Sequence, residues 1–254
     1  MSQARDAILA ARRDRAVLAP LGALAPADEA AGYALQRELA EALGAVPPAG
    51  FKIGATAKGM QAYLGLAGPV AGFVAKEGLH SAGATLRYAD FFRVGVECEV
   101  GVRLGRDIAP GAITPAQAGA AVAEVFPAIE IVEKRYDDLG ALGVPTLIAD
   151  QVFHGGGVTG APAPAWPEID LAAVRGRLTV DGAVKGEGLG ADLLGHPLNA
   201  LAWLADSGAA HAFGGLKAGQ VVFLGSVTPP IWLEGPGAVD VAFEGLGMVT
   251  LRFV

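Results

Sequence analysis

The feature that most constrains this chain is the stretch VGVECEVGV, residues 94–102, in which two acids alternate with apolar residues. Side chains on a β-strand point alternately to its two faces, so Glu97 and Glu99 share one face while Cys98 takes the other. Burying two neighbouring carboxylates is costly unless a positive group lies between them. The stretch therefore predicts a strand whose carboxylates either bind a divalent cation or face water.

The composition limits the class of protein. Hydrophobic residues make up 52% of the 254 residues, yet no run approaches the ~18 apolar residues of a membrane span, and the N-terminus lacks a signal-peptide core. We therefore expect a cytoplasmic location and no membrane partner. A single cysteine excludes an internal disulfide. A net charge of -7 without a basic cluster argues against nucleic acid and favours a small-molecule ligand. The surplus apolar surface predicts a homo-oligomer.

The pattern of apolar residues changes at about residue 48. Helices are predicted near residues 3–18 and 27–43, the second carrying an apolar stripe of Leu35, Leu39 and Leu43. From residue 50 onward, short apolar runs split by glycines are typical of a curved sheet. We expect an α+β protein with an N-terminal helical segment, residues 1–48, and one β-rich catalytic domain, residues 49–254.

Further elements are expected within the β-rich part. A helix is predicted from Pro115 to Val125, followed by a strand over residues 128–132 that contains Glu130. Residues 161–167 form a proline-rich loop. The segment RLTVDGAVKGEG predicts a hairpin with Asp181-Gly182 as its turn, and a helix is expected after His196-Pro197. The chain then returns to strands.

Three acids stand in apolar, strand-like settings, namely Glu97, Glu99 and Glu130. Hard divalent cations such as Mg²⁺ or Mn²⁺ prefer oxygen ligands, so three converging carboxylates suit an open site for one of them. The four histidines are scattered without HxH or HxxxH spacing, and this gives little support to a zinc site.

Other polar residues are candidates for substrate binding or proton transfer. Lys52 interrupts the apolar run GFKIG, either as a buried amine that binds a substrate carboxylate or moves a proton, or as a lysine extending from a strand end to solvent. His154 is either a general base near neutral pH or a structural histidine. The segment LGSVTPP, residues 224–230, places Ser226 and Thr228 beside a glycine turn suited to an anion. The sequence contains neither a GxSxG motif nor a dinucleotide fingerprint after a strand.

Seven segments in order resemble the 2-keto-4-pentenoate hydratase and 4-oxalocrotonate decarboxylase branch of the fumarylacetoacetate hydrolase superfamily. The similarity runs from about residue 30 to the C-terminus and so covers most of the chain. The segments are GFKIGATAKGMQAYLG (50–65), VECEVGVRLGRDI (96–108), FPAIEIVEKRY (126–136), LIADQ (147–151), GADLLGHPLNALAWLA (190–205), LKAGQVVFLGS (216–226) and FEGLGMVTLRF (243–253). As a set they are specific to the branch.

The resemblance implies a mixed β-roll and a single Mg²⁺ or Mn²⁺ ligated by Glu97, Glu99 and Glu130. It places the catalytic or substrate-binding lysine of the family at Lys52. The implied substrate is a 2-oxo or 2-hydroxydienoate acid that passes through a metal-stabilised enolate, from which water adds or CO₂ is lost. Some members of such pathways form complexes with a neighbouring pathway enzyme.

Two departures from the family pattern separate the alternatives. Val70 stands where hydratases of the branch carry an acid. Decarboxylases of the branch also lack that acid, and Arg135-Tyr136 fits their pattern. The family's A/S-D-N-A-S motif is here Ala149-Asp150-Gln151-Val152-Phe153, in which Gln151 is the candidate substrate ligand and neighbouring His154 is the candidate replacement base. We expect a hydratase first, a decarboxylase second, and a non-catalytic binding or partner subunit third.

Overall fold

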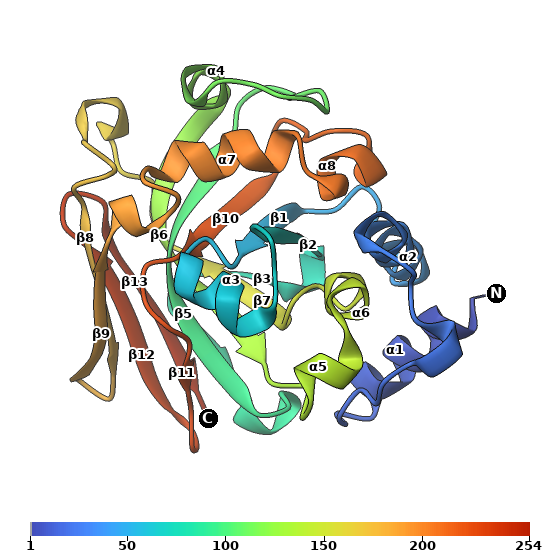
Figure 1. Ribbon diagram of the computed structural model, residues 1–254. Helices are drawn as coiled ribbons and strands as arrows, with labels where there is room; N and C mark the ends of the chain where they lie inside the picture. The colour runs from blue at the N-terminus through green and yellow to red at the C-terminus, as the bar shows by residue number, and fades with distance from the viewer. Residues whose placement is uncertain (1) are drawn as a thin grey trace.

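The larger of two sheets carries the centre of the molecule (Figure 1). The structure is a computed structural model and describes residues 2–254. Eight strands form this sheet in the order β2-β1-β10-β5-β6-β7-β3, with β11 paired to β5. Their bounds are β1 (Gly50–Gly54), β2 (Val70–Val74), β3 (Leu79–Ser81), β5 (Val94–Leu104), β6 (Val122–Glu133), β7 (His154–Thr159), β10 (Val221–Ser226) and β11 (Ile231–Trp232).

A second sheet of five strands stands beside the first, in the order β4-β13-β12-β8-β9. Its strands are β4 (Ala84–Leu86), β8 (Arg175–Val180), β9 (Ala183–Leu189), β12 (Gly237–Phe243) and β13 (Gly247–Phe253). The predicted hairpin is confirmed as β8 and β9, because Asp181 and Gly182 both have positive φ, 50° and 77°, as a two-residue turn requires. Both sheets mix parallel and antiparallel pairs, so the α+β prediction is confirmed.

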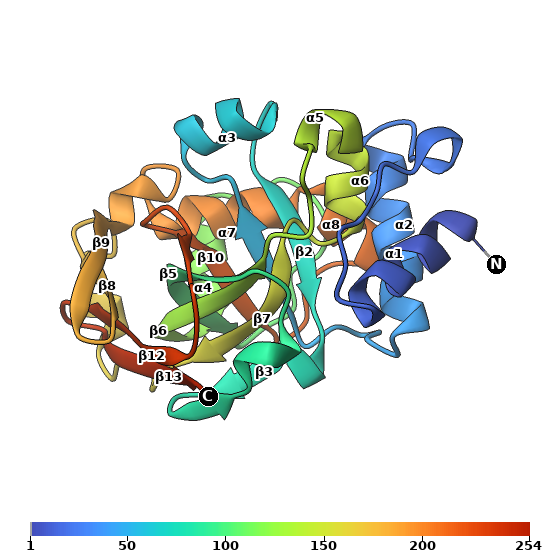
Figure 2. The same ribbon diagram turned by 90° about the horizontal axis from the view of Figure 1, so that it is seen from below.

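Helices cover the larger sheet on several sides. In Figures 1 and 2, α1, α2 and α6 gather at one end, α7 and α8 cross one face, and α3 stands off the sheet. The bounds are α1 (Gln3–Arg13), α2 (Glu29–Ala42), α3 (Lys58–Leu64), α4 (Pro115–Ala120), α5 (Leu139–Leu142), α6 (Val144–Ala149), α7 (Pro197–Ala205) and α8 (Gly208–Phe213). Among residues 2–254, none of these helices combines the length and apolarity needed to cross a membrane.

The helix predictions hold in part. Asp28 caps α2 by accepting a hydrogen bond from the Ala31 amide, and Leu35 and Leu39 are buried as expected. Leu43 is 44% exposed because it lies at the C-cap, beyond the last full turn.

Two predicted helix ends are wrong. The first helix stops at Arg13 rather than near residue 18. The helix predicted over residues 115–125 stops at Ala120, because the following residues pair with β5 as the start of β6, Val125 opposite Val102. Alanine-rich propensity yields here to strand pairing.

Candidate active site

Strands β5 and β6 bring the three predicted acids together. Glu97 and Glu130 are direct partners across the antiparallel pair, and Glu99 lies two residues along the same face. One oxygen from each carboxylate lies within 4.8 Å of the others. Glu99 and Glu130 have no solvent exposure and Glu97 is partly buried, so the alternative that these acids face water is wrong. Cys98 points away into the core, as predicted.

Hydrogen-bond donors of the protein satisfy only some of the oxygens of these three carboxylates. Glu99 Oε2 accepts a hydrogen bond from the Gly225 amide at 2.9 Å. Glu130 Oε1 lies 2.8 Å from His154 Nδ1 and 3.3 Å from Lys52 Nζ. Glu99 Oε1 and Glu130 Oε2 are buried and have no partner among the described residues. Two orphaned carboxylate oxygens beside a third acid fit a divalent cation.

Burial and repulsion shift the acids in different directions. Loss of solvent, and then the charge of Glu130, raise the pKa of Glu97 to about 8. The same two causes raise the pKa of Glu99 well above its usual value. Burial opposes ionisation of Glu130 too, but Lys52 and His154 outweigh it and lower its pKa. Without a bound cation, the negative charge is therefore concentrated on Glu130.

Lys52 is the buried amine of the site. Its side chain leaves β1 and is 2% exposed, so the alternative of a lysine reaching solvent is wrong. Nζ donates a hydrogen bond to the Val152 carbonyl oxygen at 2.5 Å and forms the ion pair with Glu130. Gly54 follows on the same face, and a Cβ there would lie 3.3 Å from Nζ. A larger residue at position 54 would therefore crowd the amine, which lies beside the carboxylates on the wall of a cavity.

The turn that meets Lys52 has an unusual backbone. Gln151, Val152 and Phe153 all have positive φ, at 59°, 52° and 68°. Non-glycine residues seldom adopt this region, least of all a β-branched one, so three in succession are costly and need external contacts. The result is that the Val152 carbonyl faces Lys52 while the Phe153 side chain lines a cavity.

A buried ion cluster supplies those contacts. Asp150, at the start of the turn, accepts hydrogen bonds from Arg12 Nε at 2.5 Å, Arg135 Nε at 2.9 Å and the Tyr136 hydroxyl at 2.6 Å. Arg135 Nη2 also donates to the carbonyl oxygens of Asp150 and His154, at both ends of the turn. The two guanidiniums outweigh burial and lower the pKa of Asp150. The cluster fixes the left-handed turn in place.

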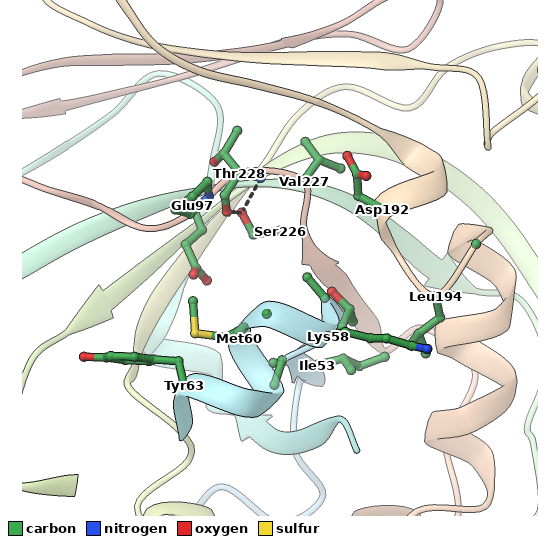
Figure 3. A pocket seen from close by; sticks show the side chains of 17 residues that line it. Ile53, Lys58, Met60, Tyr63, Glu97, Asp192, Leu194, Ser226, Val227 and Thr228 are labelled. Atoms are coloured by element: carbon green, nitrogen blue, oxygen red, sulfur yellow. Dashed lines mark hydrogen bonds between the residues drawn. The ribbon is translucent and has the colours of Figure 1, made fainter. Parts of the chain in front are cut away.

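Two cavities meet at Glu97. The first, of about 760 Å³, is shown in Figure 3, with Glu97 on one side and Met60 and Tyr63 of α3 on the other. Its wall includes Ser226 and Thr228. The second, of about 630 Å³, is lined by Lys52 and by aromatic residues that include Phe153. Both volumes lie in the range of roughly 300–1,000 Å³ typical of small-molecule sites.

The remaining predicted site residues fall into two groups. Thr228 lines the first cavity, is 6% exposed, and its Oγ1 has no partner among the described residues. Ser226 lines the same cavity, with its hydroxyl bonded to backbone atoms, including the Thr228 carbonyl at 2.7 Å. Gln151 and His154 are buried and line neither cavity: Gln151 donates to the Phe73 carbonyl, and His154 contacts Glu130.

Sequence reasoning missed the role of Arg12, and a signal for it exists. Ala4 and Ile8 are the buried residues of α1, and Arg12 follows them at the same four-residue spacing. An arginine on the apolar stripe of a helix predicts a buried acidic partner. Nothing local identifies that partner as Asp150, which lies 138 residues away along the chain.

Comparison with known proteins identifies the family of this chain. The model of the fumarylacetoacetate (FAA) hydrolase C-terminal family matches residues 60–254. In solved structures, the chain resembles 4-oxalocrotonate decarboxylase from Pseudomonas putida G7 complexed with magnesium and adipate. That match has a TM-score of 0.89 at 23% identity and covers 99% of this chain and 96% of that one. The chain belongs to the fumarylacetoacetate hydrolase family.

Curated relatives narrow the branch. The chain is 34% identical over 250 residues to 2-keto-4-pentenoate hydratase 2 of Dechloromonas aromatica (strain RCB), covering 96% of this chain and 94% of the relative. It is 30% identical over 203 residues to a 4-oxalocrotonate decarboxylase of a Pseudomonas species, covering 79% and 77%. The chain is thus a member of the lyase branch of this family, and the predicted resemblance is confirmed.

Proposed function

We propose that the protein is a divalent-metal-dependent lyase of 2-oxo and 2-hydroxydienoate acids, acting as a hydratase similar to 2-keto-4-pentenoate hydratase. The observation that carries this proposal is the buried amine of Lys52, 3.3 Å from Glu130 and on the wall of a cavity that also contains Glu97. A candidate proton-transfer group, Lys52, and one carboxylate of the proposed cation site, Glu97, therefore line the same cavity.

The metal ligands would be Glu97, Glu99 and Glu130. A bound Mg²⁺ or Mn²⁺ would stabilise the negative charge that develops on the C2 oxygen of the substrate. Thr228 and Ser226 line the first cavity, where they would contact the substrate carboxylate. Ser226 also orders the backbone of Thr228, since its hydroxyl bonds the Thr228 carbonyl.

Lys52 would move the proton. Adding water to the conjugated chain places a hydroxyl on C4 and protons on C3 and C5. Water supplies the hydroxyl and one proton, and the C2 hydroxyl supplies the other proton as it becomes a ketone. Nζ is held by the Val152 carbonyl and by Glu130 on the wall of the cavity, where it would exchange a proton with the substrate chain. We propose that His154 positions Glu130 through its Nδ1–H and acts as a base only if its ring is freed from that bond.

The test is turnover of 2-hydroxypenta-2,4-dienoate by the purified protein with Mn²⁺, followed by loss of dienol absorbance. Lys52→Met should lose turnover and keep Mn²⁺ binding in calorimetry. Lys185→Met, at an exposed position on β9, is the matched control and should behave as wild type. Retained Mn²⁺ binding with no turnover of any 2-oxo acid would contradict the lyase proposal and favour a binding or partner subunit.

Decarboxylation is the second candidate, favoured by the relative named 4-oxalocrotonate decarboxylase at 30% identity. It is tested by incubating the Mn²⁺-loaded protein with 2-oxohex-3-enedioate and measuring released CO₂. Release at a rate above the hydration rate would reverse the order of the two candidates.

We also propose that the chain forms a homo-oligomer through the second sheet. Val184 and Leu189 on β9 and Met248 on β13 are large apolar residues that are 38–59% exposed. Light scattering after gel filtration tests this proposal, and a monomer at micromolar concentration would contradict it. Mixing with a pathway enzyme in the same experiment tests for a larger complex.

A further inference from the structure

We infer that the second cavity is a tail chamber that accepts an apolar substituent as large as an aryl ring on the distal carbon of the acid. The inference deepens the proposed function, because it rests on the 2-oxo acid head lying at the carboxylate triad. The tail chamber is defined by Lys52, Glu97, Tyr136, Phe153 and Trp232 together with Lys134, Asp137, Asp138 and neighbouring apolar residues.

The chamber is continuous with the reacting centre. Glu97 lines both cavities, and so do Met60 and Tyr63 of α3, which Figure 3 shows facing the Glu97 carboxylate. A substrate whose head lies beside Glu97 can therefore extend its chain into the second cavity. At about 630 Å³, this cavity has far more room than the last carbons of a five-carbon acid occupy.

Three aromatic rings shape the chamber. The Tyr136 and Phe153 rings meet edge to face, with centroids 4.9 Å apart, and Phe153 and Trp232 lie 6.4 Å apart. The Tyr136 hydroxyl is fixed by Asp150, and the backbone of Phe153 is fixed in the left-handed turn. The rings are therefore pre-positioned, as a surface that recognises another flat apolar group requires.

Trp232 is a large apolar side chain that the core does not fully bury. It lies on the short strand β11 and is 39% exposed. Its ring lies directly over Gly95 of β5, where a Cβ would come within 2.7 Å of Trp232 Cε3. Only glycine leaves room for the ring there, so Gly95 allows the indole to lie close to β5, with its centroid 6.4 Å from that of Phe153.

The charges around the chamber disfavour a second carboxylate on the substrate. The cationic Lys52 is already engaged by Glu130, and Arg135 is engaged by Asp150. At the rim stand Asp137, Asp138 and Lys134, and Lys134 is exposed. Asp137 is bonded by Arg93 at 2.5 Å, and Asp138 accepts from the Ala141 amide. A tail carboxylate would enter a space with no free buried cation among residues 2–254.

The experiment compares three saturated 2-oxo acids on the Mn²⁺-loaded protein by calorimetry: 2-oxopentanoate, 2-oxo-5-phenylpentanoate and 2-oxohexanedioate. The phenyl acid should bind at least about tenfold more tightly than 2-oxopentanoate, because a buried ring is removed from water. The diacid should bind more weakly than the phenyl acid. Phe153→Ser and Trp232→Ala should each reduce the phenyl-to-propyl affinity ratio several-fold. Trp166→Ala is the control, since Trp166 lines neither cavity, and should preserve that ratio.

The outcomes separate the two proposals. Equal affinity for the propyl and phenyl acids, tightest binding of the diacid, or an unchanged ratio in both variants would overturn the tail chamber while leaving the head site intact. Failure of all three acids to bind would overturn the proposed function and the chamber with it.

Discussion

Two buried charge clusters lie on opposite sides of the same turn and differ in how far they are satisfied. Around Asp150, both carboxylate oxygens and the backbone carbonyl have donors from Arg12, Arg135 and Tyr136. Around Glu130, two of the carboxylate oxygens in the triad have none. Asp150, Glu99 and Glu130 are all at most 1% exposed, so exposure does not explain the difference.

The Asp150 cluster, whose oxygens all have donors, is a contact that stabilises the fold. The carboxylates with unsatisfied oxygens form a candidate site for a ligand. An ion cluster whose partners are all present in the chain stabilises the fold only while it stays intact, because removing one member leaves a buried charge unpaired. A cluster with orphaned oxygens destabilises the empty fold and gains from an added cation. Substitutions in the two clusters should therefore act in opposite directions on the metal-free protein.

The largest effect is expected for Asp150→Asn. Two buried guanidiniums would lose their counter-charge, so we expect the free energy of unfolding in urea at neutral pH to fall by about 3–5 kcal/mol. Because the pKa of Asp150 is lowered from 3.8, its charge stabilises the fold above that value. The gap between variant and wild type should close as pH falls through the lowered pKa. A constant gap would contradict this linkage.

Glu99→Gln should give the contrasting result. We expect Mn²⁺ to bind about 100-fold more weakly or worse, since a direct ligand is lost. The metal-free variant should be about 1 kcal/mol more stable than wild type, because a buried carboxyl without a full set of partners is removed. The pKa of Glu99 is raised, so this gain should appear only above its usual value of 4.5. A metal-free variant that is less stable than wild type would contradict the proposed contrast between the two clusters.

Metal affinity should depend on pH through the raised acids. Glu97, with a pKa raised to about 8, and Glu99 must lose protons before they can ligate a cation. Mn²⁺ affinity should therefore fall about tenfold per pH unit for each proton displaced as pH drops from about 8 to about 6. Calorimetry in buffers of different ionisation enthalpy would count the released protons. Affinity that does not change with pH would show that the acids are already ionised.

Arg12→Gln tests the support of the turn with the smallest change. Arg12 is 20% exposed and shares Asp150 with Arg135, so we expect a loss of stability of about 1 kcal/mol and a several-fold fall in kcat with little change in KM. Amide hydrogen exchange in residues 150–154 of the metal-free protein should rise. Arg13→Gln is the control, because its exposed pair with Asp14 contributes little. Equal effects of the two variants would contradict the assignment.

Local patterns predicted the centre of the site well. Alternation in VGVECEVGV placed Glu97 and Glu99 on one face. The apolar settings of Glu130 and Lys52 marked both as candidates, and the family resemblance implied a role for each. These residues lie on regular strands, where sequence spacing fixes the direction of a side chain.

The surroundings of the site could not be read the same way. Gln, Val and Phe carry no signal for a left-handed turn, because each is poorly suited to it and only long-range contacts hold it. The Arg12–Asp150 pair joins residues 138 positions apart, and the helix over 115–125 yields to pairing with β5. Tertiary contacts decide each of these features, and a single sequence does not display them.

Arg135 forms hydrogen bonds to both ends of the turn, and this limits how the sequence of the site can change. Its guanidinium spans the carbonyls of Asp150 and His154, a gap set by the three residues between them. Inserting or deleting one residue there would release an end and misplace the Val152 carbonyl. The loop length is therefore fixed, whereas the side chain at position 153 is free to change. Substrate preference in this fold can therefore change by a single substitution at position 153, whereas a graft that changes the loop length would disrupt the site.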